Sequence, residues 1–149
     1  MSTNKAKGTK WETDLVRSLS AFFRGRSGLA PRRVAQEGFL DTGDLHGLSP
    51  FVGQAKNWAS WQDAIREGLD GAEVQRLRAG ESYGVAFVKR VRRSPGDAYA
   101  VTTIATWARV LARLRRAEEF LVRTATVDDL DAYQAENRAD LEAPFPKAS

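Results

Sequence analysis

Cysteine is absent from this chain, and histidine occurs once. The first absence excludes disulfides, thiolate zinc sites and cysteine nucleophiles, and the second excludes a site built from several histidines of one chain. No apolar run approaches the roughly 20 residues that span a bilayer, and the polar, basic N-terminus has no apolar segment behind it. We therefore expect a cytoplasmic protein with no membrane partner, in which any metal ligands are acidic oxygens.

The 149 residues suffice for one domain with a core, and 42% hydrophobic with 28% charged residues is typical of a soluble globular protein. The net charge of +4 conceals a segregation. Two blocks are basic: residues 1–40 contain eight basic and three acidic residues, and residues 81–116 contain eight basic and two acidic residues. The other two blocks are acidic: residues 41–80 contain four basic and six acidic residues, and residues 117–149 contain three basic and eight acidic residues. Basic blocks around an acidic centre suit a polyanion. The alternative is that these arginines are ordinary solvated surface residues.

A hairpin is predicted for Gly43–Lys56, GDLHGLSPFVGQAK, because two short strand-like runs enclose glycine, serine and proline. Side chains alternate along a strand, so Gln54 and Lys56 point the same way and Ala55 points into the core. If Asp44 lies across from Gln54, two oxygens and an amine converge. Mg²⁺ takes oxygen ligands and keeps several waters, and a lysine can orient such a water. The pattern indicates phosphodiester hydrolysis, and its alternative is an ordinary polar hairpin.

Asp44 followed by Gln54–Lys56 resembles the D…(D/E)xK core of the PD-(D/E)XK nucleases, with Gly43 in the place of the proline. Upstream, Lys7–Glu12, KGTKWE, resembles the GxxxE start of the archaeal and phage Holliday junction resolvase branch of that superfamily. The resemblance covers roughly residues 7–114. It implies a restriction-endonuclease-like α/β core, a mixed sheet flanked by helices, that cuts four-way or other branched DNA in recombination.

The resemblance also implies a role for each site residue. Glu12, Asp44, the side-chain oxygen of Gln54 and the carbonyl of Ala55 would hold Mg²⁺ or Mn²⁺, and Lys56 would orient the attacking water. Gln54 stands where the family has Glu or Asp, so this site carries one negative charge fewer. A junction has two symmetric scissile strands, so a homodimer is the expected form.

The first helix is expected to follow a basic arm, residues 1–7, and to end at Gly25. Thr9 to Glu12 forms a T-x-x-E capping box, which gives Glu12 an alternative role in bonding the backbone N–H of Thr9. Its neighbours place Glu12 on the border of a buried stripe, which favours the catalytic role. The stripe consists of Trp11, Leu15, Val16, Leu19, Phe22 and Phe23.

Two other polar residues near the hairpin, Asp41 and His46, are not assigned to the metal site. Val34–Phe39 predicts the first strand. Asp41 precedes Asp44 by three residues, but the turn between them leaves Asp41 outside the strand, so we choose Asp44 as the ligand. His46 is left out of the metal site, because a lone histidine near a turn is more often a surface residue.

After the hairpin, Ser60 is predicted to cap a helix that reaches Gly80, with Gly68 and Gly71 weakening it. Trp58 and Trp61 are expected to pack in the core rather than to stack on unpaired bases, with Trp58 the better candidate for exposure.

Two further strands are predicted at Tyr83–Val88 and Ala98–Ile104, joined by a basic turn. Thr106 then caps a helix with an apolar face of Trp107, Val110, Leu111 and Leu114 inward and Arg109, Arg113 and Arg116 outward. Phosphate contacts are expected at two clusters of basic residues: Arg24, Arg26, Arg32, Arg33, Lys89, Arg90, Arg92 and Arg93.

The chain is expected to divide into a nuclease-like core, residues 1–124, and an acidic helical appendage, residues 125–149, that opens with a capping box at Thr126. Metal-dependent DNA endonuclease activity is the favoured function, with cleavage of linear DNA as an alternative. Two other classes stay open. One is a DNA-binding module of the same fold that has lost catalysis, and the other is an interaction protein whose acidic and basic segments assemble into oligomers.

Overall fold

The computed structural model describes residues 3–34 and 41–148. Its elements follow in the order α1 (Thr3–Phe23), β1 (Arg32–Arg33), β2 (Leu45–Leu48), β3 (Phe51–Lys56), α2 (Trp61–Ala79), β4 (Tyr83–Val88), the 3-10 turn η1 (Pro95–Asp97), β5 (Tyr99–Val101), α3 (Ile104–Thr124) and α4 (Val127–Glu142). The predicted order of helix, three strands, helix, two strands and helix is confirmed. No described helix is both long and apolar enough to cross a membrane.

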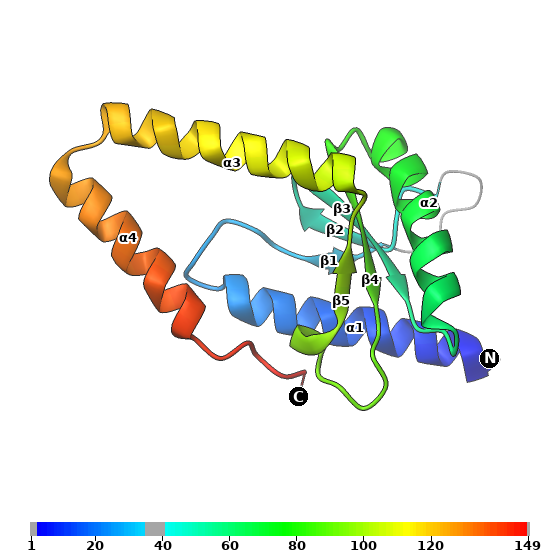
Figure 1. Ribbon diagram of the computed structural model, residues 1–149. Helices are drawn as coiled ribbons and strands as arrows, with labels where there is room; N and C mark the ends of the chain where they lie inside the picture. Colours follow the sequence, from blue (N-terminus) through cyan, green and yellow to red (C-terminus); the bar gives the residue numbers. More distant parts are fainter. Residues whose placement is uncertain (1–2, 35–40, 149) are drawn as a thin grey trace. The chain divides into compact units, whose positions relative to one another are not determined.

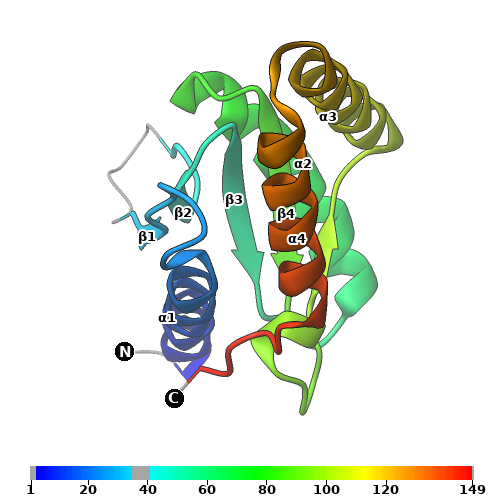
Figure 2. The same ribbon diagram turned by 90° about the vertical axis from the view of Figure 1, so that its left-hand side faces the viewer.

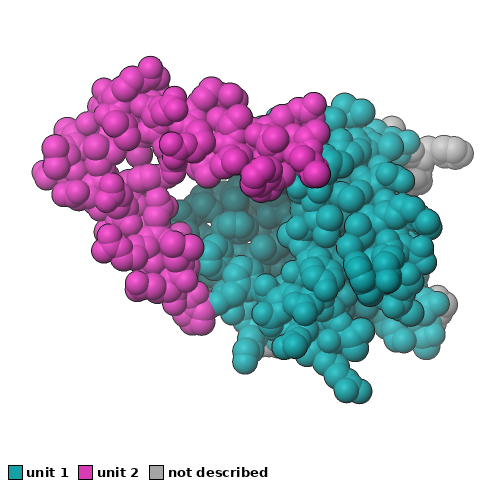
Figure 3. Space-filling model, in the orientation of Figure 1, with its two compact units in different colours: residues 1–103, 145–149 teal, residues 104–144 magenta. Residues whose placement is uncertain are grey.

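The chain forms two compact units, coloured separately in Figure 3. The first contains residues 1–103 and 145–149, and the second contains residues 104–144. This division differs from the predicted one after residue 124. The prediction followed the change in charge, whereas α3 continues unbroken from Ile104 and joins α4 through a link of two residues, Ala125 and Thr126.

The first unit is built on one mixed sheet with the strand order β1-β2-β3-β4-β5 (Figure 1). Neighbouring strands are antiparallel except β3 and β4, which run parallel from the pair Phe51 and Tyr83 to the pair Lys56 and Val88. A parallel pair needs a crossover connection, and α2 supplies it. The predicted α/β class, with a mixed sheet flanked by helices, is confirmed.

Helices α1 and α2 lie on opposite faces of this sheet (Figure 2). Trp11 and Leu15 of α1 pack with Leu45 and Leu48 of β2, and Ala55 joins the same cluster. On the other face, α2 packs against β4 through a second cluster: Ala64, Ile65, Leu69, Ala86 and Val88. Strand alternation therefore points Ala55 into the α1 core, as predicted, and turns Gln54 and Lys56 to the α2 face.

Helix α2 begins as predicted, because the Ser60 hydroxyl accepts a hydrogen bond from the backbone N–H of Asp63, 3.3 Å away. Its glycines do not divide it. They let the helix approach the sheet closely: a Cβ on Gly68 would lie 3.0 Å from the Cβ of Ala86, and one on Gly71 would lie 3.2 Å from Oε1 of Gln54. The glycines that weaken the helix locally thus fix its distance from β3 and β4.

Several predicted boundaries were wrong. Helix α1 begins at Thr3, so residues 3–7 are helical and Thr9 lies inside the helix instead of capping it. The structure gives β1 only Arg32–Arg33, and most of the predicted strand Val34–Phe39 lies outside the described residues. Strand β5 is shorter than predicted and ends at Val101.

The predictions for α3 were also partly wrong. The helix begins two residues early, so Thr106 lies buried within its first turn instead of capping it. Trp107, Leu111 and Leu114, expected to face inward, are exposed. The spacing identified an apolar face correctly, but spacing does not say whether another element covers that face. The capping box at the start of α4 is confirmed, with Thr126 and Asp129 each bonding the other's backbone N–H.

Gly84→Ala should destabilise the fold by about 1–3 kcal/mol, the usual cost of overpacking. A Cβ there would lie 2.5 Å from the backbone oxygen of Ala72, so α2 would have to move. Gly28→Ala is the matched control, because no atom lies within 4 Å of its added Cβ. Urea unfolding measures both variants, and equal stability would contradict the close packing of α2 on β4.

Candidate functional site

A cavity of about 410 Å³ lies at the end of β3, beside the N-terminal half of α1. Its wall contains every residue of the predicted metal and catalytic set: Glu12, Asp44, Gln54, Ala55 and Lys56. They come from α1, from the turn before β2 and from β3. The other lining residues are Asn4, Lys7, Gly8, Asn57, Trp58 and Ala59. The fold therefore brings the predicted residues together, and we call this cavity the carboxylate pocket.

Asp44 is held across the hairpin by two hydrogen bonds to one of its oxygens. Oδ2 accepts from Nε2 of Gln54 at 2.8 Å and from the backbone N–H of Ala55 at 2.7 Å. The backbone N–H of Asp44 donates to the carbonyl of Gly53 at 3.0 Å, which continues the β2–β3 pairing. Both side-chain bonds go to Oδ2, and no described residue donates to Oδ1. Oδ1 is therefore the oxygen available to a ligand.

The pKa of Asp44 is raised from 3.8 to about 6, mainly because burial disfavours the charged form. The N–H of Ala55 opposes this shift, and the negative charges of Glu12 and Asp41 add to it. Lys56 lowers the pKa of Asp44. A buried carboxylate beside a second acid is unfavourable until a cation compensates it, which is common at functional sites.

Glu12 reaches the pocket from the third turn of α1. Its carboxylate pairs with Nε of Arg33 at 2.8 Å, and its side chain is only 19% exposed. Glu12 does not form a capping box with Thr9, because Thr9 lies inside the helix. Gly8 lies one turn earlier on the same face, since residues four apart on a helix are neighbours. The GxxxE spacing thus places a carboxylate and an open helix surface side by side.

Gln54 differs from the expected arrangement in its orientation. Its amide nitrogen faces Asp44, whereas its oxygen Oε1 is buried and has no hydrogen-bond partner among the described residues. A buried acceptor without a partner costs about 1–3 kcal/mol. Rotating the amide by half a turn would bring Oε1 to the oxygen of Asp44, which is favourable only with a cation or a proton between them. Gln54 can therefore offer its oxygen to an ion only in the rotated orientation, which would leave its NH₂ group in the position beside Gly71.

Lys56 lies on the same wall of the pocket. Its Nζ is 5.1 Å from the ring centroid of Trp58, within cation–π range. The backbone around it is fixed, because its carbonyl accepts a hydrogen bond from the N–H of Lys89 at 2.9 Å. The ammonium is thereby kept beside the carboxylates without a direct ion pair in the described structure.

A metal at this site would need amide or backbone oxygens as well as acids. In residues 3–34 and 41–148, no three Asp, Glu or His side chains gather in a group that could hold a metal ion. Glu12 and Asp44 supply two carboxylates, and the carbonyl of Ala55 and the amide of Gln54 are the further oxygens of the pocket. This is a set of hard ligands, suited to Mg²⁺ or Mn²⁺ completed by water.

Asp41 and His46 have structural contacts instead. The carboxylate of Asp41 accepts from the N–H of Gly43 at 3.0 Å and from Nε2 of Gln75 at 2.8 Å, so it shapes the turn before β2. Nε2 of His46 lies 2.8 Å from the carbonyl of Thr42. Neither residue lines the carboxylate pocket, whereas Asp44 does.

Of the predicted phosphate-binding residues, only Arg33 reaches the site. It lines a second cavity of about 390 Å³ that shares Gly8, Glu12 and Asp44 with the first. Arg24, Arg26 and Arg32 line neither cavity, and neither do Lys89, Arg90, Arg92 and Arg93 of the β4–β5 turn. Two arginines also have local partners: Arg26 donates to the carbonyl of Phe22, and Arg90 donates to the carbonyl of Asp97.

Lys5, Lys7 and Asn4 line these cavities but were missed from the sequence. They were assigned to a flexible arm because the T-x-x-E pattern at Thr9 was taken as the start of the helix. Extending the helix towards the N-terminus would have placed Asn4, Gly8 and Glu12 on one face.

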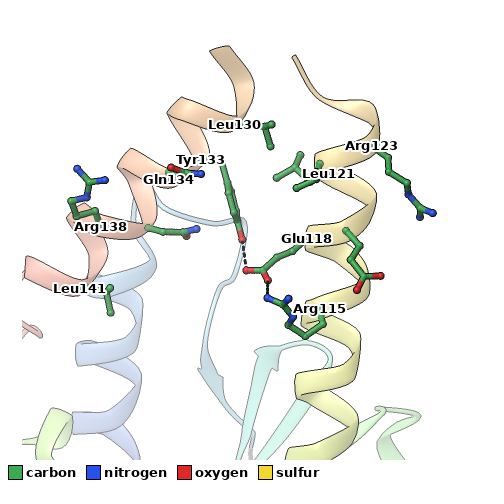
Figure 4. A pocket seen from close by; sticks show the side chains of 12 residues that line it. Arg115, Glu118, Leu121, Arg123, Leu130, Tyr133, Gln134, Arg138 and Leu141 are labelled. Atoms are coloured by element: carbon green, nitrogen blue, oxygen red, sulfur yellow. Dashed lines mark hydrogen bonds and ion pairs between the residues drawn. The ribbon is translucent and has the colours of Figure 1, made fainter. Parts of the chain in front are cut away.

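A larger cavity, of about 770 Å³, lies in the second unit between α3 and α4 (Figure 4). Its central carboxylate, Glu118, already bonds Nη1 of Arg115 at 3.1 Å and the hydroxyl of Tyr133 at 3.4 Å. Much of the remaining wall is aliphatic: Leu121, Val122, Leu130 and Leu141. Asp44, the carboxylate with the raised pKa, lies in the carboxylate pocket, and we therefore place the candidate chemistry there.

The first unit is thus an α/β domain whose pocket combines a raised-pKa carboxylate, a second acid and a lysine, which is a set suited to metal-assisted hydrolysis. The chain matches no protein-family model, no curated protein and no solved structure.

Asp44→Asn should raise the free energy of unfolding by about 1–3 kcal/mol at pH 8 without metal, and by almost nothing near pH 4. A folded pKa of about 6 against 3.8 means that the stabilisation from Asp44 is present below pH 4 and is lost as the pH rises through 6. Asparagine keeps an acceptor for Ala55 and avoids that loss.

Urea unfolding at the two pH values measures this difference. Asp70→Asn, at an exposed position of α2, is the control and should change stability little at either pH. A loss of stability in Asp44→Asn at pH 8 would mean that the carboxylate has a structural role in the metal-free fold.

Proposed function

We propose that this chain is a metal-dependent endonuclease that cuts branched DNA, most like a Holliday junction resolvase of the PD-(D/E)XK superfamily. The observation that carries the proposal is the convergence of Glu12, Asp44 and Lys56 in one pocket from separate segments of the chain. The alternative interpretation, an ordinary polar hairpin, does not explain why Glu12 of α1 lines the same pocket. The restriction-endonuclease-like assignment of the fold is part of the proposal, supported by the helix and strand order and by the parallel β3–β4 pair.

In this proposal the chain's own residues hold and orient the reacting groups. A Mg²⁺ or Mn²⁺ ion held by Asp44, Glu12 and the oxygens of Ala55 and Gln54 would supply Lewis-acid stabilisation of the phosphate. Lys56 would donate a hydrogen bond to the attacking water and stabilise charge that builds on a phosphate oxygen. Glu12 would first have to leave Arg33, which would then be available to a DNA phosphate.

A homodimer remains the proposed form, because two pockets related by a two-fold axis would meet the two scissile strands of a junction. The exposed apolar residues of α3, among them Trp107 and Leu114, are surface that such an assembly could cover.

A second candidate function is a DNA-binding module of the same fold without catalysis. It is favoured by the partners that the acids already have without an ion: Glu12 pairs with Arg33, and Gln54 donates to Asp44. Such a protein would bind junctions and need no ion.

Cleavage of a synthetic four-way junction in Mg²⁺, with linear duplex as the control substrate, tests the proposal. Asp44→Asn should abolish cleavage and leave junction binding intact. Lys56→Ala should slow the chemical step by about 10²- to 10⁴-fold with little change in metal dependence, because its partners are water and phosphate. Gln54→Glu should lower the Mg²⁺ concentration for half-maximal cleavage, because it restores a negative charge beside Asp44.

Lys10→Ala is the matched control for Lys56→Ala, since Lys10 pairs with Asp14 and lies outside the pocket. It should cut at the parent's rate. Unchanged cleavage by both Asp44→Asn and Lys56→Ala would show that the site is wrong. Junction binding by the parent chain without any cleavage would favour the second candidate function.

Binding of DNA should weaken steeply with salt, with a slope of log K against log salt of about −4 to −5 for four to six phosphate contacts. Replacing the exposed Arg92 and Arg93 together with alanine should reduce the magnitude of that slope by about 2 for every DNA substrate. Arg109 and Arg113, exposed on α3, form the comparison pair. Equal effects of both pairs, or a slope near zero, would reject the β4–β5 turn as a phosphate-binding loop.

A further inference from the structure

Trp58 exposes an indole at the wall of the carboxylate pocket. It is the second residue after β3, is 41% exposed and lines the cavity that contains Asp44 and Lys56. Trp61, at 50% exposure, is the useful comparison because its ring lies 6.2 Å from that of Tyr99 and lines neither cavity at the carboxylates. Both tryptophans were expected to pack in the core, and for both that expectation was wrong. Only Trp58 combines exposure with the candidate chemistry.

Hydrogen bonds of Asn57 and Ser60 fix the segment on both sides of Trp58. Nδ2 of Asn57 donates to the carbonyl of Lys7 in α1 at 3.2 Å, and Ser60 caps α2 two residues after Trp58. The ammonium of Lys56 lies over the ring. An aromatic side chain held this way offers a flat surface at little further cost in conformational entropy.

Lysine side chains lie on both sides of the two carboxylates, Glu12 and Asp44. The two cavities share Gly8, Glu12 and Asp44, so they adjoin at the carboxylates. Lys7 lines the cavity on the Trp58 side, and Lys5 lines the other. No atom lies within 4 Å of a Cβ added to Gly8, so the helix surface between the lysines is open. This arrangement suits a phosphate backbone that passes over the carboxylates with one nucleotide beside the indole.

We propose that Trp58 stacks on an unpaired nucleobase next to the scissile phosphate, so that the site takes a strand that is locally single-stranded in preference to continuous duplex. A base inside a duplex has both faces covered by its neighbours, whereas an unpaired base at a branch, flap or bulge has a face available for stacking. The cavity of about 410 Å³ falls in the range of about 300–1,000 Å³ that holds small organic ligands. This inference rests on the proposed nuclease function and specifies its substrate.

The test is a binding measurement without cleavage, in EDTA or Ca²⁺, by fluorescence anisotropy of a labelled duplex with one unpaired nucleotide. Replacing that nucleotide's base by an abasic site should weaken binding to the parent chain by about 5- to 100-fold, the usual range for loss of one base–aromatic stack. In Trp58→Leu the abasic and natural substrates should bind alike. Trp58→Phe should retain part of the difference, and Trp61→Leu should retain all of it.

The comparison of abasic and natural DNA on the parent chain needs no variant, so a folding defect in Trp58→Leu leaves the test intact. The inference would be overturned by equal binding of the two substrates to the parent chain, or by a difference that persists in Trp58→Leu. Its failure is distinct from failure of the nuclease function. A chain that cuts junctions but ignores the abasic site loses only the stacking role, and a chain that senses the abasic site but never cuts loses only catalysis.

Discussion

The pair of hydrogen bonds that Asp44 accepts across the β2–β3 hairpin, from the amide of Gln54 and the backbone of Ala55, determines most of the candidate site. It fixes the strand register at the position where the carboxylate emerges. A shift of one residue would turn Gln54 and Lys56 to the α1 face and Ala55 to the α2 face. It also commits one carboxylate oxygen to the protein, so that the other is directed to the cavity. The remaining groups of the pocket are arranged around this fixed oxygen.

The close packing of α2 holds Gln54 and Lys56, the two side chains that flank Ala55 on the other face of β3. Gly68 and Gly71 bring the helix against Lys56 and Gln54, which excludes water from the α2 side of the hairpin. Burial is the largest cause of the raised pKa of Asp44, and the nearby Glu12 adds to it. In the proposed nuclease, a cation bound at this carboxylate would offset the cost of that burial.

Much of the site could be predicted from the sequence because it depends on local geometry. The alternation of β3 and the turn before it were enough to align Asp44, Gln54 and Lys56. The position of Glu12 required knowing that α1 crosses the end of β3, and this came from resemblance rather than from periodicity. The lysines of the first turns were missed because a T-x-x-E sequence was taken as a helix start, whereas α1 begins at Thr3 and its residues 3–7 are helical but exposed. The exposure of Trp107 was missed because an apolar stripe predicts a buried face without identifying its partner.

Gln54 gains a physical explanation from this site. A glutamate in its place would put a second negative charge within hydrogen-bond distance of the half-buried Asp44, and in the absence of a cation one of the two would have to hold a proton. The glutamine removes that repulsion and adds a donor, so the metal-free hairpin is more stable than its acidic equivalent. The cost appears at the other end of the amide, where Oε1 is left without a partner beside Gly71. Glutamine thus replaces repulsion between two anions with one unsatisfied acceptor.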